Sequence, residues 1–438
     1  MPLIIVAIGI ALLLILIIVF KINAFIAFTI VSLAVGVAEG LPLGKTALSI
    51  QQGMGDTLGS LVIILGFGAM LGKLVADSGA AQRISSKLIS LFGLKKVQWA
   101  LMLTGFIVGI PMFYSVGFVI LIPLVFTIAV STGLPLLYVA VPLIASLSVT
   151  HGFLPPHPAP TAVAVMFGAD IGKTLIYGLI ISVPAIIIGG PLFARSIKRI
   201  NATPLKEFVN TEVLKEDEMP GLWNSILTTI LPVILIGISS VSGFILSDNL
   251  KVKTLFESLG DPVIAMLISL IVAFFTLGLT RGEKTAVIME SLGHSVASIT
   301  MVLLIIAGAG GLKQVLVDSG TSSYIGNLLS DSHLSPLFLA WLIAAVLRIC
   351  VGSATVAGLT TAGIILPLAS NGTVNKELLV LAIGAGSLMM SHVNDSGFWL
   401  FKEYFNLSVR ETFSTWTIME TIISVVGLTG VLVLNYLI

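Results

Sequence analysis

Cysteine and charged residues are both scarce in this chain of 438 residues. The single cysteine, Cys350, excludes an intramolecular disulfide and any metal site built from several thiolates. Lys, Arg, Asp and Glu make up only 10% of the chain, whereas soluble domains average about 25%. The net charge of +1 gives no sign of a nucleic acid or another polyanion as a partner. We expect no nucleic-acid partner, no metal and no cofactor.

Apolar runs take the place of the missing charge, since 57% of the residues are hydrophobic. Runs such as 3–20, 22–38, 262–280 and 414–436 each approach the ~20 residues that a helix needs to cross ~30 Å of hydrocarbon. Such runs recur from one end of the chain to the other, which is not the pattern of a soluble domain with one anchor. The sequence therefore predicts an all-α polytopic protein in the lipid bilayer of the cytoplasmic (inner) membrane.

The second half of the chain repeats landmarks of the first half. Asp-Ser-Gly at 77–79 recurs at 318–320, and His151 recurs at the same offset as His392. Separate landmarks that share one offset indicate a duplication. We expect two repeats, 1–194 and 223–438, joined by a charged linker at 195–222.

The basic residues predict that the two repeats have opposite orientations. The loop after Gly79 is rich in Lys and Arg, whereas its counterpart at 321–335 has neither. The positive-inside rule places the first loop in the cytoplasm and the second outside. The N-terminus is then outside and the linker at 195–222 cytoplasmic. This membrane topology is self-consistent only if 98–132 and 336–370 are re-entrant hairpins that return to the side they entered. Inverted repeats with broken helices are typical of secondary transporters.

The predicted hairpin tips carry small and polar residues inside apolar runs, where such residues usually indicate a cavity. The first tip reads GIPMFYSVG at 109–117, and the second reads RICVGSATVAG at 348–358. Free backbone N–H groups at such tips can bind a carboxylate or hydroxyl groups, although small residues also serve helix packing. The candidate binding residues at the tips are Tyr114, Ser115, Ser353 and Thr355.

Two further breaks interrupt predicted membrane helices, at about 134–170 and 376–413. Prolines follow His151 and surround His157, and they cannot continue a helix. The second break runs from His392 to Gly397 and contains Asp395. Two matched histidines at helix breaks indicate a binding site, although an interhelical hydrogen bond is the alternative for each.

Arg348 lies between two apolar stretches, where an unpaired charge costs several kcal/mol. Such an arginine needs an anion, which a guanidinium group can hold with two hydrogen bonds. The sequence leaves two partners open, the carboxylate of a substrate and the side chain of Asp395.

Over essentially its whole length the chain resembles the gluconate permease family of the ion transporter superfamily. The resemblance is carried by GFGAMLGKLVADSGAAQRI (66–84), SVTHGFLPPHPAPTA (148–162), LRICVGSATVAG (347–358) and SHVNDSGFWLFKEYFNLS (391–408). It implies uptake of gluconate or a related sugar acid by proton symport. It also implies a homodimer, with scaffold helices (about 1–57 in the first repeat) at the interface and the hairpins and broken helices in a mobile transport unit. Among the substrate-binding residues, the resemblance adds Pro156, Gly352 and Asn394.

One departure from the family pattern bears on coupling, because the family usually has an acidic residue where this chain has Ser115. If that acid carries the coupling proton in the family, this chain needs another group. The titratable candidates are His151, His157, His392 and Asp395, and histidine titrates near neutrality. Sodium coupling is the rival, because carbonyl groups at helix breaks can coordinate a cation.

Several other functions stay open at this point. A passive channel would favour continuous polar faces, whereas this chain concentrates its polarity at four breaks. An intramembrane enzyme could use His151, Ser148 and Asp395, but no nucleophile motif such as GxSxG accompanies them, so we expect no enzyme. The residues do not decide between gluconate, idonate, glycerate and D-serine, nor do they exclude uncoupled transport.

Overall fold

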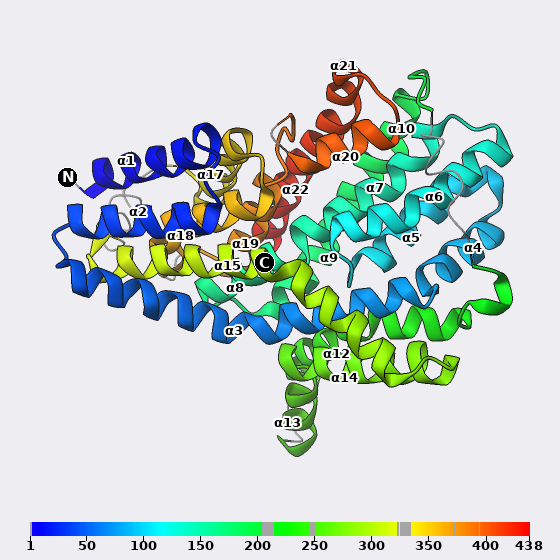
Figure 1. Ribbon diagram of the computed structural model, residues 1–438, viewed down its shortest axis with the longest axis horizontal. Helices are drawn as coiled ribbons and strands as arrows, with labels where there is room; N and C mark the ends of the chain where they lie inside the picture. The colour runs from blue at the N-terminus through cyan, green and yellow to red at the C-terminus, as the bar shows by residue number, and fades with distance from the viewer. Residues whose placement is uncertain are drawn as a thin grey trace.

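The computed structural model describes residues 2–203, 214–245, 250–321, 324, 334–370, 374–393 and 395–438. All secondary structure in these ranges is helical, which confirms the predicted all-α class (Figure 1). In the same ranges, five helical segments are long and apolar enough to cross a membrane, or seven if each bent pair is one span. Asn394, a predicted site residue, lies outside the described residues.

The helices of the two halves follow one another in a matching order. The first half contains α1 (Pro2–Leu14), α2 (Ala24–Ala38), α3 (Leu43–Asp77), α4 (Ala80–Phe92), α5 (Val97–Gly109), α6 (Tyr114–Thr132), α7 (Leu136–Phe153), α8 (Pro158–Phe167), α9 (Ile171–Ile187) and α10 (Phe193–Ser196). The second half contains α12 (Leu222–Ile245), α13 (Leu250–Leu259), α14 (Pro262–Ala273), α15 (Thr285–Asp318), α17 (Pro336–Val351), α18 (Ala354–Ser370), α19 (Lys376–Gly386), α20 (Ser396–Tyr404), α21 (Val409–Thr412) and α22 (Ile418–Leu437).

The two longest helices, α3 and α15, are equivalent in the two halves and lie against each other in antiparallel directions (Figure 1). The carboxylate of Asp77 at the end of α3 accepts a hydrogen bond from Ser291 (2.7 Å), near the start of α15. Asp318 at the end of α15 accepts one from Ser49 (2.6 Å), near the start of α3. Equivalent helices that cross in opposite directions are the arrangement expected of inverted repeats.

Two helical hairpins occupy the segments for which the sequence predicts re-entrant hairpins. α5 and α6 are joined at residues 110–113, and α17 and α18 are joined at residues 352–353. Gly352 has a φ of +81°, a conformation that residues with a Cβ rarely adopt, so glycine allows the chain to reverse there. The return of each hairpin to the same side of the membrane stays a prediction.

Two helices break in the middle, at the predicted places. α7 stops at Phe153 and α8 starts at Pro158, because prolines at helix starts need no donor whereas prolines in the interior disrupt the helix. α19 stops at Gly386, and α20 starts only at Ser396. Asp395 caps this second start by accepting a hydrogen bond from the Gly397 N–H (3.0 Å).

The charged linker between the halves is attached to α4 where the structure describes it. Arg83 is buried, and its Nε donates to the Pro220 carbonyl (2.7 Å) while Nη1 donates to Glu216 (2.9 Å). Lys87 forms a second ion pair with Glu216. These two cations, Lys87 foremost, hold the pKa of Glu216 below its ordinary value.

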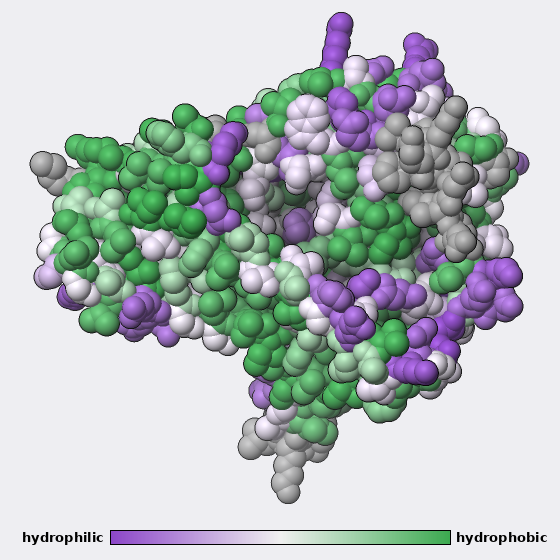
Figure 2. All heavy atoms as spheres, in the orientation of Figure 1, coloured by the Kyte–Doolittle hydropathy of each residue, from purple (hydrophilic) through white to green (hydrophobic). Residues whose placement is uncertain are grey.

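The surface over α1 and α2 is largely hydrophobic (Figure 2). Ile8 of α1 and Ile26 of α2 are 62% and 51% exposed. Exposed aliphatic side chains of this kind favour contact with lipid over contact with water.

Candidate functional site

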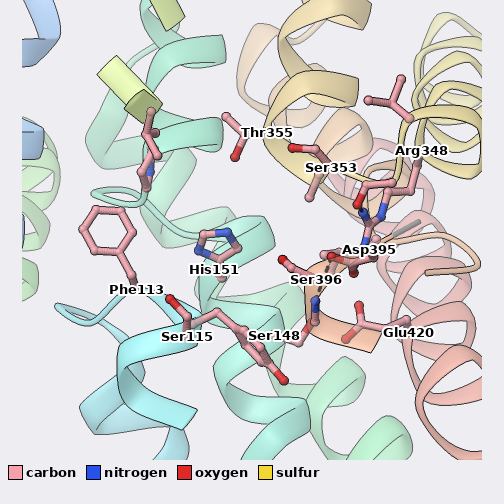
Figure 3. A pocket seen from close by; sticks show the side chains of 18 of the residues that line it. Phe113, Ser115, Ser148, His151, Arg348, Ser353, Thr355, Asp395, Ser396 and Glu420 are labelled. Carbon is pink, nitrogen blue, oxygen red and sulfur yellow. Dashed lines mark hydrogen bonds and ion pairs between the residues drawn. The ribbon is translucent and has the colours of Figure 1, made fainter. Parts of the chain in front are cut away.

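A cavity of about 420 Å³ lies where the two hairpin tips and the two helix breaks meet. Its volume falls within the roughly 300–1,000 Å³ of small-molecule sites. Eight of the predicted site residues line it (Figure 3): Tyr114, Ser115, His151, Arg348, Gly352, Ser353, Thr355 and Asp395. Residues from opposite halves of the sequence therefore share one site.

Four helices begin at this cavity, and each half of the chain contributes two of them. They are α6 and α8 from the first half, and α18 and α20 from the second half. The first N–H groups of a helix have no partner within it, and they carry a partial positive charge. The residues of these first turns that line the cavity are Tyr114, Ser115, Pro158, Ala354, Thr355, Ser396 and Gly397. Of these, Pro158 has no N–H, and the N–H of Gly397 is bonded to Asp395. Converging helix starts of this kind favour an anion.

Arg348 is buried at the end of α17, with 3% of its surface exposed. Its Nη2 donates to the carboxylate of Asp395, and its Nη1 donates to the carbonyl oxygen of Gly352. Its Nε has no hydrogen-bond partner in the described part of the chain. Of the two partners that the sequence leaves open, the structure therefore contains the Asp395 pair, which joins the second hairpin to the second helix break.

Hydroxyl groups surround the cavity on several sides. Ser115, Ser148, Ser353, Thr355 and Ser396 all line it. Ser353 is partly engaged, because its Oγ accepts a hydrogen bond from the Val356 N–H (3.3 Å). Since a hydroxyl group both donates and accepts, this lining matches a ligand that carries several hydroxyl groups of its own.

The two histidines of the first break differ in position. His151 lines the cavity, whereas His157 lies behind it, with the two Nδ1 atoms 3.4 Å apart. His157 donates from Nε2 to the carbonyl oxygen of Gly109 (2.8 Å). Together with Pro156, it lines a separate small pocket beneath the first hairpin. His157 and Pro156 thus support the first hairpin and do not line the main cavity.

His392 also lies outside the cavity lining. Its Nε2 donates to the carbonyl oxygen of Ile349 (2.9 Å), and its ring stacks on Phe413. This contact with the last turn of the hairpin's first helix matches the contact between His157 and Gly109. The sequence pairs His392 with His151, but the structure gives the equivalent bond to His157.

Sequence reasoning missed an acidic residue of the site, Glu420 on α22. Glu420 is 1% exposed, lines the cavity and has no hydrogen-bond partner for either carboxylate oxygen among the described residues. Trp416 lines the cavity one turn earlier and donates from Nε1 to Ser391 (2.7 Å). The signal was present, because an acidic residue inside the apolar run 414–436 is rare and usually functional.

Over nearly its whole length, the chain is similar in sequence to named bacterial transporters. The L-idonate transporter of the Gnt-II system of Escherichia coli is 54% identical over 99% of both chains. A high-affinity gluconate transporter of the same organism is 53% identical over the whole of both chains. The gluconate permease of Bacillus subtilis is 47% identical over 99% of both chains.

Two solved structures share the fold at low sequence identity. The YdaH transporter of Alcanivorax borkumensis has a TM-score of 0.66 at 14% identity, over 94% of this chain and 97% of its own. MtrF of Neisseria gonorrhoeae has a TM-score of 0.70 at 15% identity, over 94% of both chains. These two likenesses confirm an all-helical membrane fold with broken spans. The model of the GntP permease family matches residues 1–437, so the chain belongs to the GntP family of permeases.

Proposed function

We propose that this permease imports gluconate or a closely related sugar acid across the cytoplasmic membrane together with a proton. The observation that carries the proposal is the meeting of four helix starts and a buried arginine in one cavity lined with hydroxyl groups. A sugar acid has one carboxylate and a chain of hydroxyl groups, and the cavity offers a partner for each. Relatives that are named as gluconate and L-idonate transporters are about half identical to the whole chain.

The two ends of the substrate require different contacts. The carboxylate is placed at the first turns of α6 and α18, within reach of Arg348, because positive helix ends and a guanidinium group both stabilise an anion. The hydroxyl chain extends along Ser148, His151 and Ser396, which line the same cavity. An interaction through Arg348 would leave Asp395 in place as its permanent counter-charge.

Proton symport follows from the charge of the substrate. Moving one elementary charge across a membrane is worth ~2.3 kcal/mol per 100 mV, and a potential that is negative inside opposes the entry of an anion. A proton that enters with the anion cancels the transferred charge, so the membrane potential no longer opposes uptake. We also propose that the N-terminus lies outside and that the linker at 195–222 is cytoplasmic. The protein is proposed to be a homodimer, with residues 1–57 contributing to the interface. The two hairpins and the two broken helices then move as a unit against α3 and α15.

Uptake of labelled gluconate into proteoliposomes tests this function. We expect accumulation under an inward proton gradient without sodium, and we expect a protonophore to abolish it. Unlabelled idonate should compete, since it differs from gluconate only in the arrangement of its hydroxyl groups. A strict sodium requirement would contradict proton coupling, and failure to move either sugar acid would contradict the substrate.

A further inference from the structure

Glu420 is an acidic residue of the cavity for which the described residues provide no counter-charge. Its carboxylate is buried and lacks a hydrogen bond for both oxygens in the described part of the chain. Ser148 lines the same cavity. Figure 3 shows Glu420 beside Asp395, facing the same space.

The charges of the other described residues that line the cavity already balance without Glu420. Arg348 forms an ion pair with Asp395, and these two charges cancel. Asp395 also accepts hydrogen bonds from Ser391 and from the Gly397 N–H. An ionised Glu420 would be a bare buried charge, and such a charge is costly enough that the group takes up a proton instead.

A bound sugar acid makes this imbalance larger. The carboxylate of the substrate brings one negative charge into the cavity, whose only described cation, Arg348, is already paired. Two unbalanced carboxylates in one low-dielectric cavity repel each other strongly, so that binding of the anion favours protonation of Glu420. The substrate and the proton thus bind together.

We propose that Glu420 is the binding site of the coupling proton. This inference rests on the proposed function and adds the residue that performs the coupling. Glu420 takes up a proton from the external solution, remains a neutral carboxylic acid while the substrate anion is bound, and releases the proton to the cytoplasm after the substrate leaves. No other bond forms or breaks.

The other titratable groups near the cavity are less suited to this role. Arg348 on α17 and Asp395 before α20 neutralise each other, and Tyr114 on α6 begins as a neutral donor. His151 on α7 faces the cavity, but its Nδ1 is directed at His157. His157 and His392 donate to backbone carbonyls and do not line the cavity. α9 and α19 also pack on α22, and their described residues add no charged side chain to the lining of the cavity.

Replacement of Glu420 by glutamine tests the inference, because glutamine resembles the protonated acid and cannot release a proton. Proteoliposomes would be loaded with a pH-sensitive dye and given labelled gluconate. A gradient of about one pH unit supports accumulation of about tenfold if one proton moves with each substrate. We expect Glu420→Gln to reduce this ratio to about one and to stop the gluconate-dependent proton influx. Exchange of internal for external gluconate, which needs no net proton movement, should persist.

Two further variants separate loss of coupling from loss of folding. Glu420→Asp keeps an ionisable carboxylate and should retain gluconate-driven proton influx. Glu290→Gln, at an exposed position of α15, should behave as the unchanged protein. Binding of gluconate to each variant would be followed by the change in tryptophan fluorescence, because Trp416 lines the cavity.

The outcomes distinguish this inference from the proposed function. If the wild-type protein transports gluconate without protons, both the proposed proton symport and the role of Glu420 are wrong. If the unchanged protein is coupled and Glu420→Gln still accumulates gluconate with proton influx, only the role of Glu420 is wrong. Loss of gluconate binding and exchange in Glu420→Gln and Glu420→Asp alike would instead make Glu420 a substrate-binding or structural residue.

Discussion

At the residue scale, the sequence identified most of the cavity because its chemistry is unusual for a membrane. Polar and charged residues are expensive in hydrocarbon, so Arg348, Asp395 and His151 stood out in apolar surroundings. The sequence could not assign their partners, because Arg348 had two possible anions and only the folded chain brings Asp395 next to it. Glu420 was missed because the run that contains it was counted only as a membrane span.

The residue-scale prediction concerns the shape of the Arg348 side chain. Arg348→Lys keeps the positive charge beside Asp395, but a single ammonium group cannot reproduce the two separate bonds to Asp395 and Gly352. Hydrogen bonds to charged groups contribute about 1.5–3 kcal/mol, so we expect gluconate uptake to fall by roughly 10- to 100-fold. Arg410→Lys, at an exposed position, is the matched control. Unchanged uptake and affinity in Arg348→Lys would exclude a role for the guanidinium group in the site.

At the scale of helices, the sequence predicted the breaks better than the contacts. Proline and glycine act locally, so the ends of α7 and the turn at Gly352 could be predicted from neighbouring residues. The contact of α3 with α15 joins segments far apart in the sequence, and no local pattern encodes it. Asp77 and Asp318 show the difference, since each accepts a hydrogen bond from the opposite helix.

The helix-scale prediction concerns the close crossing of α3 and α15. A Cβ added to Gly310 would lie 2.2 Å from Thr57 Oγ1 and 2.6 Å from the carbonyl oxygen of Gly53. Gly310→Ala therefore forces the two helices apart, and overpacking of this kind typically costs about 1–3 kcal/mol. We expect a lower melting temperature in detergent.

A second glycine of α15 provides the control for this crossing. Gly293 has open space where a Cβ would lie, so Gly293→Ala should leave the melting temperature unchanged or raise it, because alanine favours a helix more than glycine does. Equal stability of the two alanine variants would show that α3 and α15 do not pack this closely.

At the scale of the whole molecule, the antiparallel crossing of α3 and α15 supports the inversion that the basic loops predict. Two halves with opposite orientations place equivalent hairpins on either side of one cavity, so that each half supplies two of its helix starts. Alternating access then needs no new binding site on the second side of the membrane, because one cavity can open in either direction. The placement of the two faces remains a prediction, and it rests on the positive-inside rule.

The accessibility of single cysteines tests that placement directly. Lys173 lies in the first turn of the candidate span Ile171–Ser196, which has 26 residues, and Lys198 lies just after its end. At 1.5 Å per residue this span is about 39 Å long, enough to cross the ~30 Å hydrocarbon layer. In a Cys350→Ala background that retains uptake, we expect a membrane-impermeant maleimide to label Lys173→Cys in intact cells. Lys198→Cys, in the predicted cytoplasmic linker, should react only after permeabilisation. The reverse pattern would show that the chain has the opposite orientation in the membrane. Labelling of both positions in intact cells would show that this helix does not cross the membrane.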